Sequence, residues 1–164
     1  MFSFVLAGIL SVYAGNVTVP ADPGKPAAVA APNSLNKTLM LKLVNQVRSK
    51  GCQCGPTWYP PAPALLWSDQ LEEAATLHSK DMYKKSYLAH TAPDGSNGGE
   101  RIERTGYHWK SFGENIAEGY TSESEVLEGW LKSPGHCKNI LSRTYKEMGV
   151  ARTGDYWTQM FASK

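Results

Sequence analysis

Segments with strand-like alternation come late in this chain, after segments with helical periodicity. Residues 147–152 and 156–162 alternate on either side of a Thr-Gly-Asp turn, which predicts a β-hairpin. Residues 34–50, 68–85 and 122–132 carry apolar side chains at helical spacing, which predicts amphipathic helices. Because the helices precede the strands and do not alternate with them, we expect an α+β fold.

Signals at the helix ends and between the helices refine this expectation. We expect Ser34 to cap the first helix, and Asp69 with Glu72 to mark the start of the second. Pro134-Gly135 is expected to end the third helix and to turn the chain away. Residues 52–64 hold four prolines, so they are expected to form a loop.

The amino-terminal segment is expected to lie outside the folded domain. Residues 1–14 are apolar and uncharged, too short to span a membrane, and end on small residues, which predicts a signal peptide. Residues 15–33 hold four prolines without apolar periodicity, which is typical of an extended linker. Residues 34–164 then form one domain. We therefore expect a secreted protein, either extracellular or periplasmic.

The overall charge narrows the classes of partner. The formal net charge is +2, and the lysines and arginines are scattered along the chain. Nucleic-acid binding would need basic residues gathered on one face, so we expect no nucleic-acid partner. No long apolar segment follows the first residues, so we do not expect the domain to span a membrane.

Three cysteines fall in the predicted domain: Cys52, Cys54 and Cys137. In an exported protein this number predicts one disulfide and one remaining thiol. A Cys52–Cys54 bridge would close a very small strained ring, so Cys137 is expected to pair with one of the two. A zinc site built from the three cysteines and His136 is the alternative, although Cys-x-Cys is tighter than the usual ligand spacing.

Residues 113–141 hold the strongest candidate for a functional site. Glu114 lies in a Gly-Glu-Asn segment that predicts a turn, and His136 lies in a Ser-Pro-Gly-His turn. His90 lies upstream in a segment rich in Gly, Ser, Asn and Pro. Two imidazoles and a carboxylate on such segments could converge on one pocket. His78 falls on the apolar face of its helix instead, which predicts a buried, hydrogen-bonded histidine.

These three residues admit two chemistries and one purely structural interpretation. Two neutral imidazoles could hold Zn²⁺, with Glu114 as a third ligand or as the acceptor for a proton from bound water. Without a metal, a His–Glu pair could act as a general base. Alternatively, His90 could donate to Glu114 and only hold a loop in place. Neither G-x-S-x-G nor H-E-x-x-H occurs in the sequence.

Six short segments, in this order, resemble those of the CAP superfamily of secreted proteins, whose domain is also called SCP. They are Leu66-Trp67, AHTAPDG at 89–95, GENIAEG at 113–119, EGWLKSPGHCKNIL at 128–141, MGVA at 148–151 and YWTQMF at 156–161. Their spacing is similar to that of the short bacterial-type members. The resemblance implies a three-layer α-β-α sandwich with a central antiparallel sheet and a cleft on one side.

The resemblance also implies a metal-binding cleft, but this chain departs from the family pattern at two positions. Eukaryotic members carry two histidines and two glutamates there, of which His90 and Glu114 match one of each. The position of the second glutamate holds Ser133, and that of the second histidine holds Tyr156. Our hypothesis is that His136 supplies the second imidazole.

Two functions are therefore expected from the resemblance. The first is a secreted module whose cleft binds a small hydrophobic ligand or an extracellular partner protein, with a divalent metal such as Zn²⁺ as a further possibility. The second is a metal-dependent hydrolase of peptide or cell-wall material that uses His90, Glu114 and His136. A purely structural envelope protein, with its cleft filled by side chains, is a third interpretation.

Overall fold

A computed structural model describes residues 35–164 of the chain. The predicted signal peptide, the predicted linker and the Ser34 cap lie outside these residues. Among the described residues, no helix has both the length and the apolar character needed to cross a membrane.

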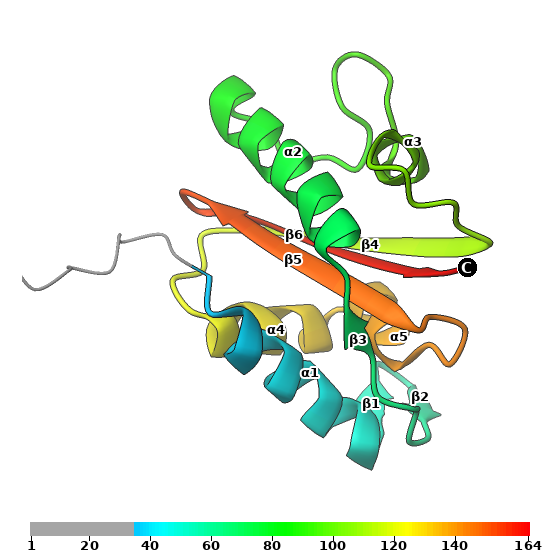
Figure 1. Ribbon diagram of the computed structural model, residues 1–164. Coiled ribbons are helices and arrows are strands. Elements are labelled where there is room, and N and C mark those ends of the chain that lie inside the picture. The colour runs from blue at the N-terminus through cyan, green and yellow to red at the C-terminus, as the bar shows by residue number, and fades with distance from the viewer. Residues whose placement is uncertain (1–34) are drawn as a thin grey trace, which may run out of the picture.

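A four-stranded sheet forms the middle of the domain (Figure 1). Its strand order is β3 (Leu66–Trp67), β5 (Glu147–Thr153), β6 (Tyr156–Ser163) and β4 (Ser111–Glu118). The three long strands pair antiparallel, and the two-residue β3 joins the edge in parallel with β5. The β5–β6 pair is the predicted hairpin, which is confirmed.

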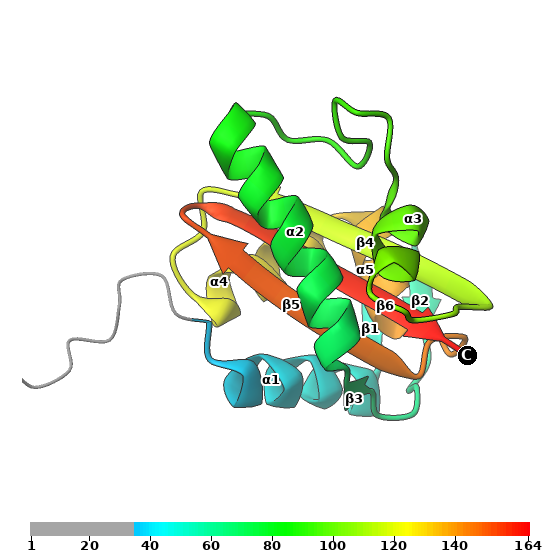
Figure 2. The ribbon, with the colours of Figure 1, turned by 45° about the horizontal axis from the view of Figure 1, so that its top comes forward.

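Helices cover both faces of this sheet (Figures 1 and 2). One face carries α2 (Asp69–Lys85) and α3 (Gly98–Arg104), and the other carries α1 (Lys37–Lys50), α4 (Glu123–Lys132) and α5 (Pro134–Leu141). Two clusters of buried apolar residues fill the two interfaces between helices and sheet. The expected three-layer α-β-α sandwich of the α+β class is confirmed.

Close approach of α2 to the sheet depends on Gly149 in β5. A Cβ at this position would collide with the backbone of Leu71 and Glu72 at the start of α2. Glycine therefore lets the helix backbone rest directly on the strand. The contact sets α2, which carries His78, on the same face of the sheet as α3 (Figure 2).

The first helix starts a few residues later than predicted, whereas the second and third start where they were expected. The cap of α1 is Asn36, whose side chain accepts a hydrogen bond from the Leu39 N–H. Ser68 caps α2 in the same manner, and Ser122 caps α4. All three are residue types that accept well from the first free N–H groups of a helix.

Three segments predicted as loops or turns are regular structure. Residues 52–64 contain a two-stranded sheet, β1 (Cys52–Cys54) and β2 (Thr57–Tyr59). The Gly-Glu-Asn segment lies inside β4 and pairs along its length with β6. The third helix ends before Pro134, as predicted, but no turn follows: Pro134 occupies the first position of α5, where its missing N–H costs nothing.

Candidate functional site

Glu114 is the centre of the polar cluster on the α2–α3 side of the sheet. It lies in β4 opposite Met160 of β6 and is only 8% exposed. Its Oε1 accepts a hydrogen bond from His90 Nδ1 at 2.7 Å, and its Oε2 accepts one from Arg101 Nη2 at 2.7 Å. Both carboxylate oxygens are therefore occupied by a neighbouring side chain.

Arg101 from α3 is the counter-charge that the sequence prediction missed. Its guanidinium is buried and also donates to two backbone carbonyls, those of Ser96 at 2.9 Å and His90 at 2.7 Å. One side chain thus fixes Glu114 and both ends of the His90 loop. Gly98 makes room for this arrangement, since a Cβ there would lie 3.3 Å from Glu114 Oε2.

His78 lies behind this cluster, on α2, and is buried as predicted. Its Nε2 donates to the Ala89 carbonyl at 2.9 Å and is 3.9 Å from Glu114 Oε1. Burial lowers the pKa of His78, and the charge of Glu114 opposes this only in part. A neutral His78 therefore holds the loop from the inside, at the residue directly before His90.

The His90–Glu114 contact is a hydrogen bond that becomes an ion pair when His90 is protonated. Its hydrogen bond to Glu114 raises the pKa of His90, and partial burial offsets a share of that rise. Burial by itself would raise the pKa of Glu114, but the His90 hydrogen bond and the Arg101 charge outweigh it, so the pKa is lowered. The ring of His90 is otherwise accessible, with 57% of its side chain exposed. Its Nε2 therefore remains available to a ligand.

His136 lies on the first turn of α5 and stays outside this ion pair. The imidazole is half-buried and makes no hydrogen bond to His90 or Glu114 in residues 35–164. Burial lowers the pKa of His136, and the positive charge of His90 lowers it further. The two rings therefore influence each other electrostatically, and the shifts are opposite: the pKa of His90 is raised and that of His136 is lowered.

An amide network holds α5 against the strand that carries Glu114. Asn139 Nδ2 donates to the Glu114 carbonyl at 3.2 Å and to Asn115 Oδ1 at 2.9 Å. Asn115 Nδ2 donates in turn to Gln159 Oε1 at 3.0 Å and to the His136 carbonyl at 3.3 Å. The backbone of His136 is thus tied to β4, whereas its ring is left free to face the cleft.

A pocket of about 270 Å³ opens beside His136. Apolar and polar side chains line it together, including the carboxylate of Glu118. The lining residues are Leu88, Ile116, Ala117, Glu118, Tyr120, Gly129, Trp130, Ser133 and His136. Its wall includes Ser133, the residue that stands where the family carries its second glutamate. The pocket is not filled by side chains, so the interpretation as a plugged structural protein loses its main support.

The donor set does not fit a three-ligand metal centre. Within residues 35–164, no three His, Cys, Asp or Glu side chains are grouped so that they could hold a metal ion. Both oxygens of Glu114 are engaged, and the buried Arg101 places a fixed positive charge against it. The predicted Zn²⁺ site at His90, Glu114 and His136 stays a prediction, and this geometry speaks against it.

A Zn²⁺ titration checks this point. In a Cys52→Ser background, which removes the free thiol, calorimetry is expected to show no binding tighter than about 10⁻⁵ M, because two imidazoles alone form an incomplete site. The His136→Ala variant should give the same heats as its parent. Micromolar binding that His136→Ala abolishes would contradict this account and restore the metal centre.

Opposite pKa shifts of two histidines are a second expected result. In an NMR titration, the pKa of His90 should lie above the ordinary histidine value of about 6.5, and that of His136 below it. A raised folded-state pKa means that His90 stabilises the fold below a pH of about 6.5 and loses this contribution as pH rises through that pKa. Glu114→Gln should bring the His90 pKa down. A His90 pKa that does not respond would contradict the ion pair.

Comparison with known proteins places this geometry in a family. A model of the CAP, or cysteine-rich secretory protein, family matches residues 41–161. Two Bacillus subtilis (strain 168) proteins are similar in sequence: YkwD is 36% identical over 102 residues, and the membrane protein YlbC is 34% identical over 100. Each match covers 61% of this chain, but only 40% of YkwD and 29% of YlbC.

Solved structures agree with the fold. An extracellular SCP-domain protein from Bacillus anthracis str. Ames superimposes with a TM-score of 0.69 and 32% identity, over 77% of this chain and 40% of its own. An outer surface protein from Borrelia burgdorferi gives a TM-score of 0.65 at 19% identity, over 77% of this chain and 91% of its own, which shows the fold alone. The matched residues include β4, α4, α5, β5 and most of β6, so this chain belongs to the CAP family.

Proposed function

We propose that the chain is an exported binding module whose cleft takes an apolar side chain of a partner protein's peptide segment. The pocket beside His136 carries this proposal. Its volume of about 270 Å³ is smaller than the roughly 300–1,000 Å³ typical of sites that enclose a whole small molecule. It suits one apolar side chain better than a bulky lipid.

The polar groups around the pocket fit a peptide. Leu88 and Ile116 supply apolar surface, while Ser133 and His136, whose pKa is lowered by burial, can exchange hydrogen bonds with a backbone amide. Protonated His90 can donate from Nε2 to a carbonyl or carboxylate. Anchoring by one apolar side chain, with polar groups setting direction, is a common mode of peptide recognition.

Export is part of the same proposal. The Cys54–Cys137 disulfide is of the kind that persists in oxidising compartments. The similar Bacillus anthracis protein is described as extracellular, whereas the similar YlbC is described as a membrane protein. We therefore propose that this domain works outside the cytoplasm, free or attached to an envelope.

Blocking the pocket tests the proposal. Ser133→Leu places a larger side chain in the pocket wall, and Ser133 makes no side-chain cap bond to α5, so little stability is lost. Short fluorescent peptides, each with one apolar residue, are screened on the parent protein. Peptides that bind should bind Ser133→Leu at least about tenfold more weakly, a loss of roughly 1.4 kcal/mol.

The matched control is Ser124→Leu, the same exchange on α4 away from this pocket. Its affinities should stay close to those of the parent. A parent that binds no peptide, or a Ser133→Leu variant that binds as well as the control, would rule out this use of the pocket.

A hydrolase remains the second candidate, and the His90–Glu114 contact favours it. A carboxylate that fixes one imidazole nitrogen and leaves the other free is the arrangement of a general base. Fluorogenic peptides and cell-wall fragments incubated with parent and His90→Ala test this. If the parent cleaves a substrate and His90→Ala does not, the result would support catalysis. Equal cleavage signals from the two proteins would leave binding as the function.

A further inference from the structure

The disulfide connects two parts of the fold that are far apart in sequence. Cys54 in β1 is bonded to Cys137 in α5 across 83 residues, with the two Cα atoms 5.5 Å apart. Cys52, at the start of β1, is free and partly exposed. The expected single bridge is confirmed, and Cys54, not Cys52, is the partner of Cys137.

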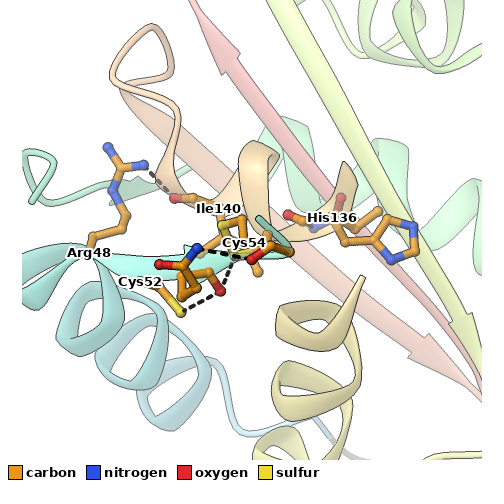
Figure 3. The surroundings of a disulfide bond; sticks show 9 residues. Arg48, Cys52, Cys54, His136 and Ile140 are labelled. Carbon is orange, nitrogen blue, oxygen red and sulfur yellow. Dashed lines mark hydrogen bonds between the residues drawn. A yellow bond between two sulfur atoms is a disulfide. The ribbon is translucent and has the colours of Figure 1, made fainter. Parts of the chain in front are cut away.

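Cys52 lies beside this bridge (Figure 3). Residues two apart on a strand point to the same face, so Cys52 and Cys54 project together. The sulfur atoms of Cys52 and Cys137 both lie near the Gln53 carbonyl oxygen, at 3.6 Å and 3.9 Å respectively. The two sulfurs can therefore be no farther apart than the sum of these distances, and the exchange proposed below requires a rotation of the Cys52 side chain together with a shift of the first turn of α5.

We propose that Cys52, Cys54 and Cys137 form a thiol–disulfide exchange centre, in which the bridge alternates between Cys54–Cys137 and Cys52–Cys137. The Cys52 thiolate attacks the Cys137 sulfur and forms the new S–S bond. The Cys54–Cys137 bond breaks, and Cys54 leaves as a thiolate that takes up a proton in place of the one Cys52 lost. One disulfide and one thiol exist before and after, so no oxidant or reductant is consumed.

The surroundings suit both states of the centre. Cys54 is 2% exposed in the apolar cluster under α1 and α5, where a released thiol behaves as a small hydrophobic side chain. Cys52 lines an open pocket of about 320 Å³ between α1 and α4, together with Val47 and Leu131. The attacking thiol is thus reachable from solvent, while the leaving thiol is sheltered.

Exchange would act on the cleft through α5. Cys137 directly follows His136 in the sequence. When Cys137 is bridged to Cys52 instead of Cys54, the point on β1 to which α5 is bonded moves by two residues, about 6.6 Å along the strand. The far end of α5 is held by buried Arg48, which donates to the Ile140 carbonyl at 2.6 Å (Figure 3). The same side chain donates to the Ser142 carbonyl at 2.9 Å. Because Arg48 anchors the carboxyl end of α5, we expect the first turn of α5, which carries His136, to move when the bridge changes partner.

Differential alkylation of the native protein tests the exchange. The protein is incubated in mildly alkaline buffer without reductant, quenched with acid, denatured, and labelled with N-ethylmaleimide. Fragmentation of the peptide that contains both cysteines then assigns the label to Cys52 or Cys54. We expect most label on Cys52 and a minor share, on the order of 1–10%, on Cys54. Label confined to Cys52 would overturn the proposal.

Two variants give an independent check. Cys54→Ser should form the Cys52–Cys137 bridge and show no free thiol, with circular dichroism confirming that it is folded. Cys52→Ser is the matched control: it keeps the original bridge and has no thiol to exchange. A folded Cys54→Ser protein in which Cys52 and Cys137 both stay free would overturn the proposal. If Cys54→Ser does not fold, the label distribution in the parent still decides.

Discussion

Glu114→Gln is expected to lower the free energy of unfolding by about 3–5 kcal/mol, because it leaves the buried Arg101 guanidinium without its counter-charge. Glutamine keeps the shape of the side chain, so the loss reports on the charge and on the hydrogen bond whose acceptor oxygen becomes an NH2 donor, and not on packing. Both partners are at least 95% buried, which removes most solvent screening of the pair. Urea denaturation followed by tryptophan fluorescence, near neutral pH, measures the change.

The matched control for this prediction is Glu103→Gln. Glu103 also contacts a histidine, His108, but both side chains are largely exposed. Exposed pairs contribute about 0–1 kcal/mol, so this variant should be nearly as stable as the parent. Equal losses in Glu114→Gln and Glu103→Gln would show that the buried cluster does not hold the fold together.

Cys137→Ser is expected to cost roughly 4–5 kcal/mol, since it removes both of the long-range bridges, to Cys54 and to Cys52, that the three cysteines allow. The bridge joins residues 83 positions apart. A bridge that closes a long loop lowers the entropy of the unfolded chain more than one that closes a short loop. Denaturation of the parent and the variant, both without reductant, measures the difference.

Cys52→Ser separates the effect of the bridge from that of losing a thiol. Cys52 is only partly buried and is not bridged, so its replacement should change stability by less than about 0.5 kcal/mol. Reductant should then destabilise Cys52→Ser but leave Cys137→Ser unchanged. A Cys137→Ser protein as stable as the parent would show that the bridge contributes little.

Local periodicity and capping were enough to predict the main helices and the hairpin. The apolar stripe of α1, the Ser122 start of α4 and the alternation of β5 and β6 are strong short-range signals, and each element formed where it was expected. The three-layer arrangement came from the family resemblance. The stripes show which faces are buried, but not which face of the sheet each helix covers.

Turn-forming residues caused the errors. Glycine and asparagine favour turns in isolation, yet Gly113 and Asn115 lie in β4 because pairing with β6 and burial outweigh the local preference. Pro134 is a helix breaker in the middle of a helix and a good first residue of one. A single sequence does not distinguish these two positions.

The candidate site was only partly predictable. His90 and Glu114 were expected as neighbours and do form a contact at 2.7 Å. Arg101 was missed because it sits in the charged run Glu-Arg-Ile-Glu-Arg, which is typical of a solvated helix face. The one available signal was Glu114 itself, since a buried carboxylate requires a partner. His136 was expected to join the pair and lies beside it instead.

The claim that the pocket beside His136 takes an apolar side chain is tested most directly by NMR with N-acetyl-leucine amide as a minimal probe. The account predicts chemical-shift changes that saturate and centre on Leu88, Ile116 and His136, and that vanish in Ser133→Leu. Saturable changes centred elsewhere, such as the separate pocket at Trp109 and Glu103, or none at all, would contradict it.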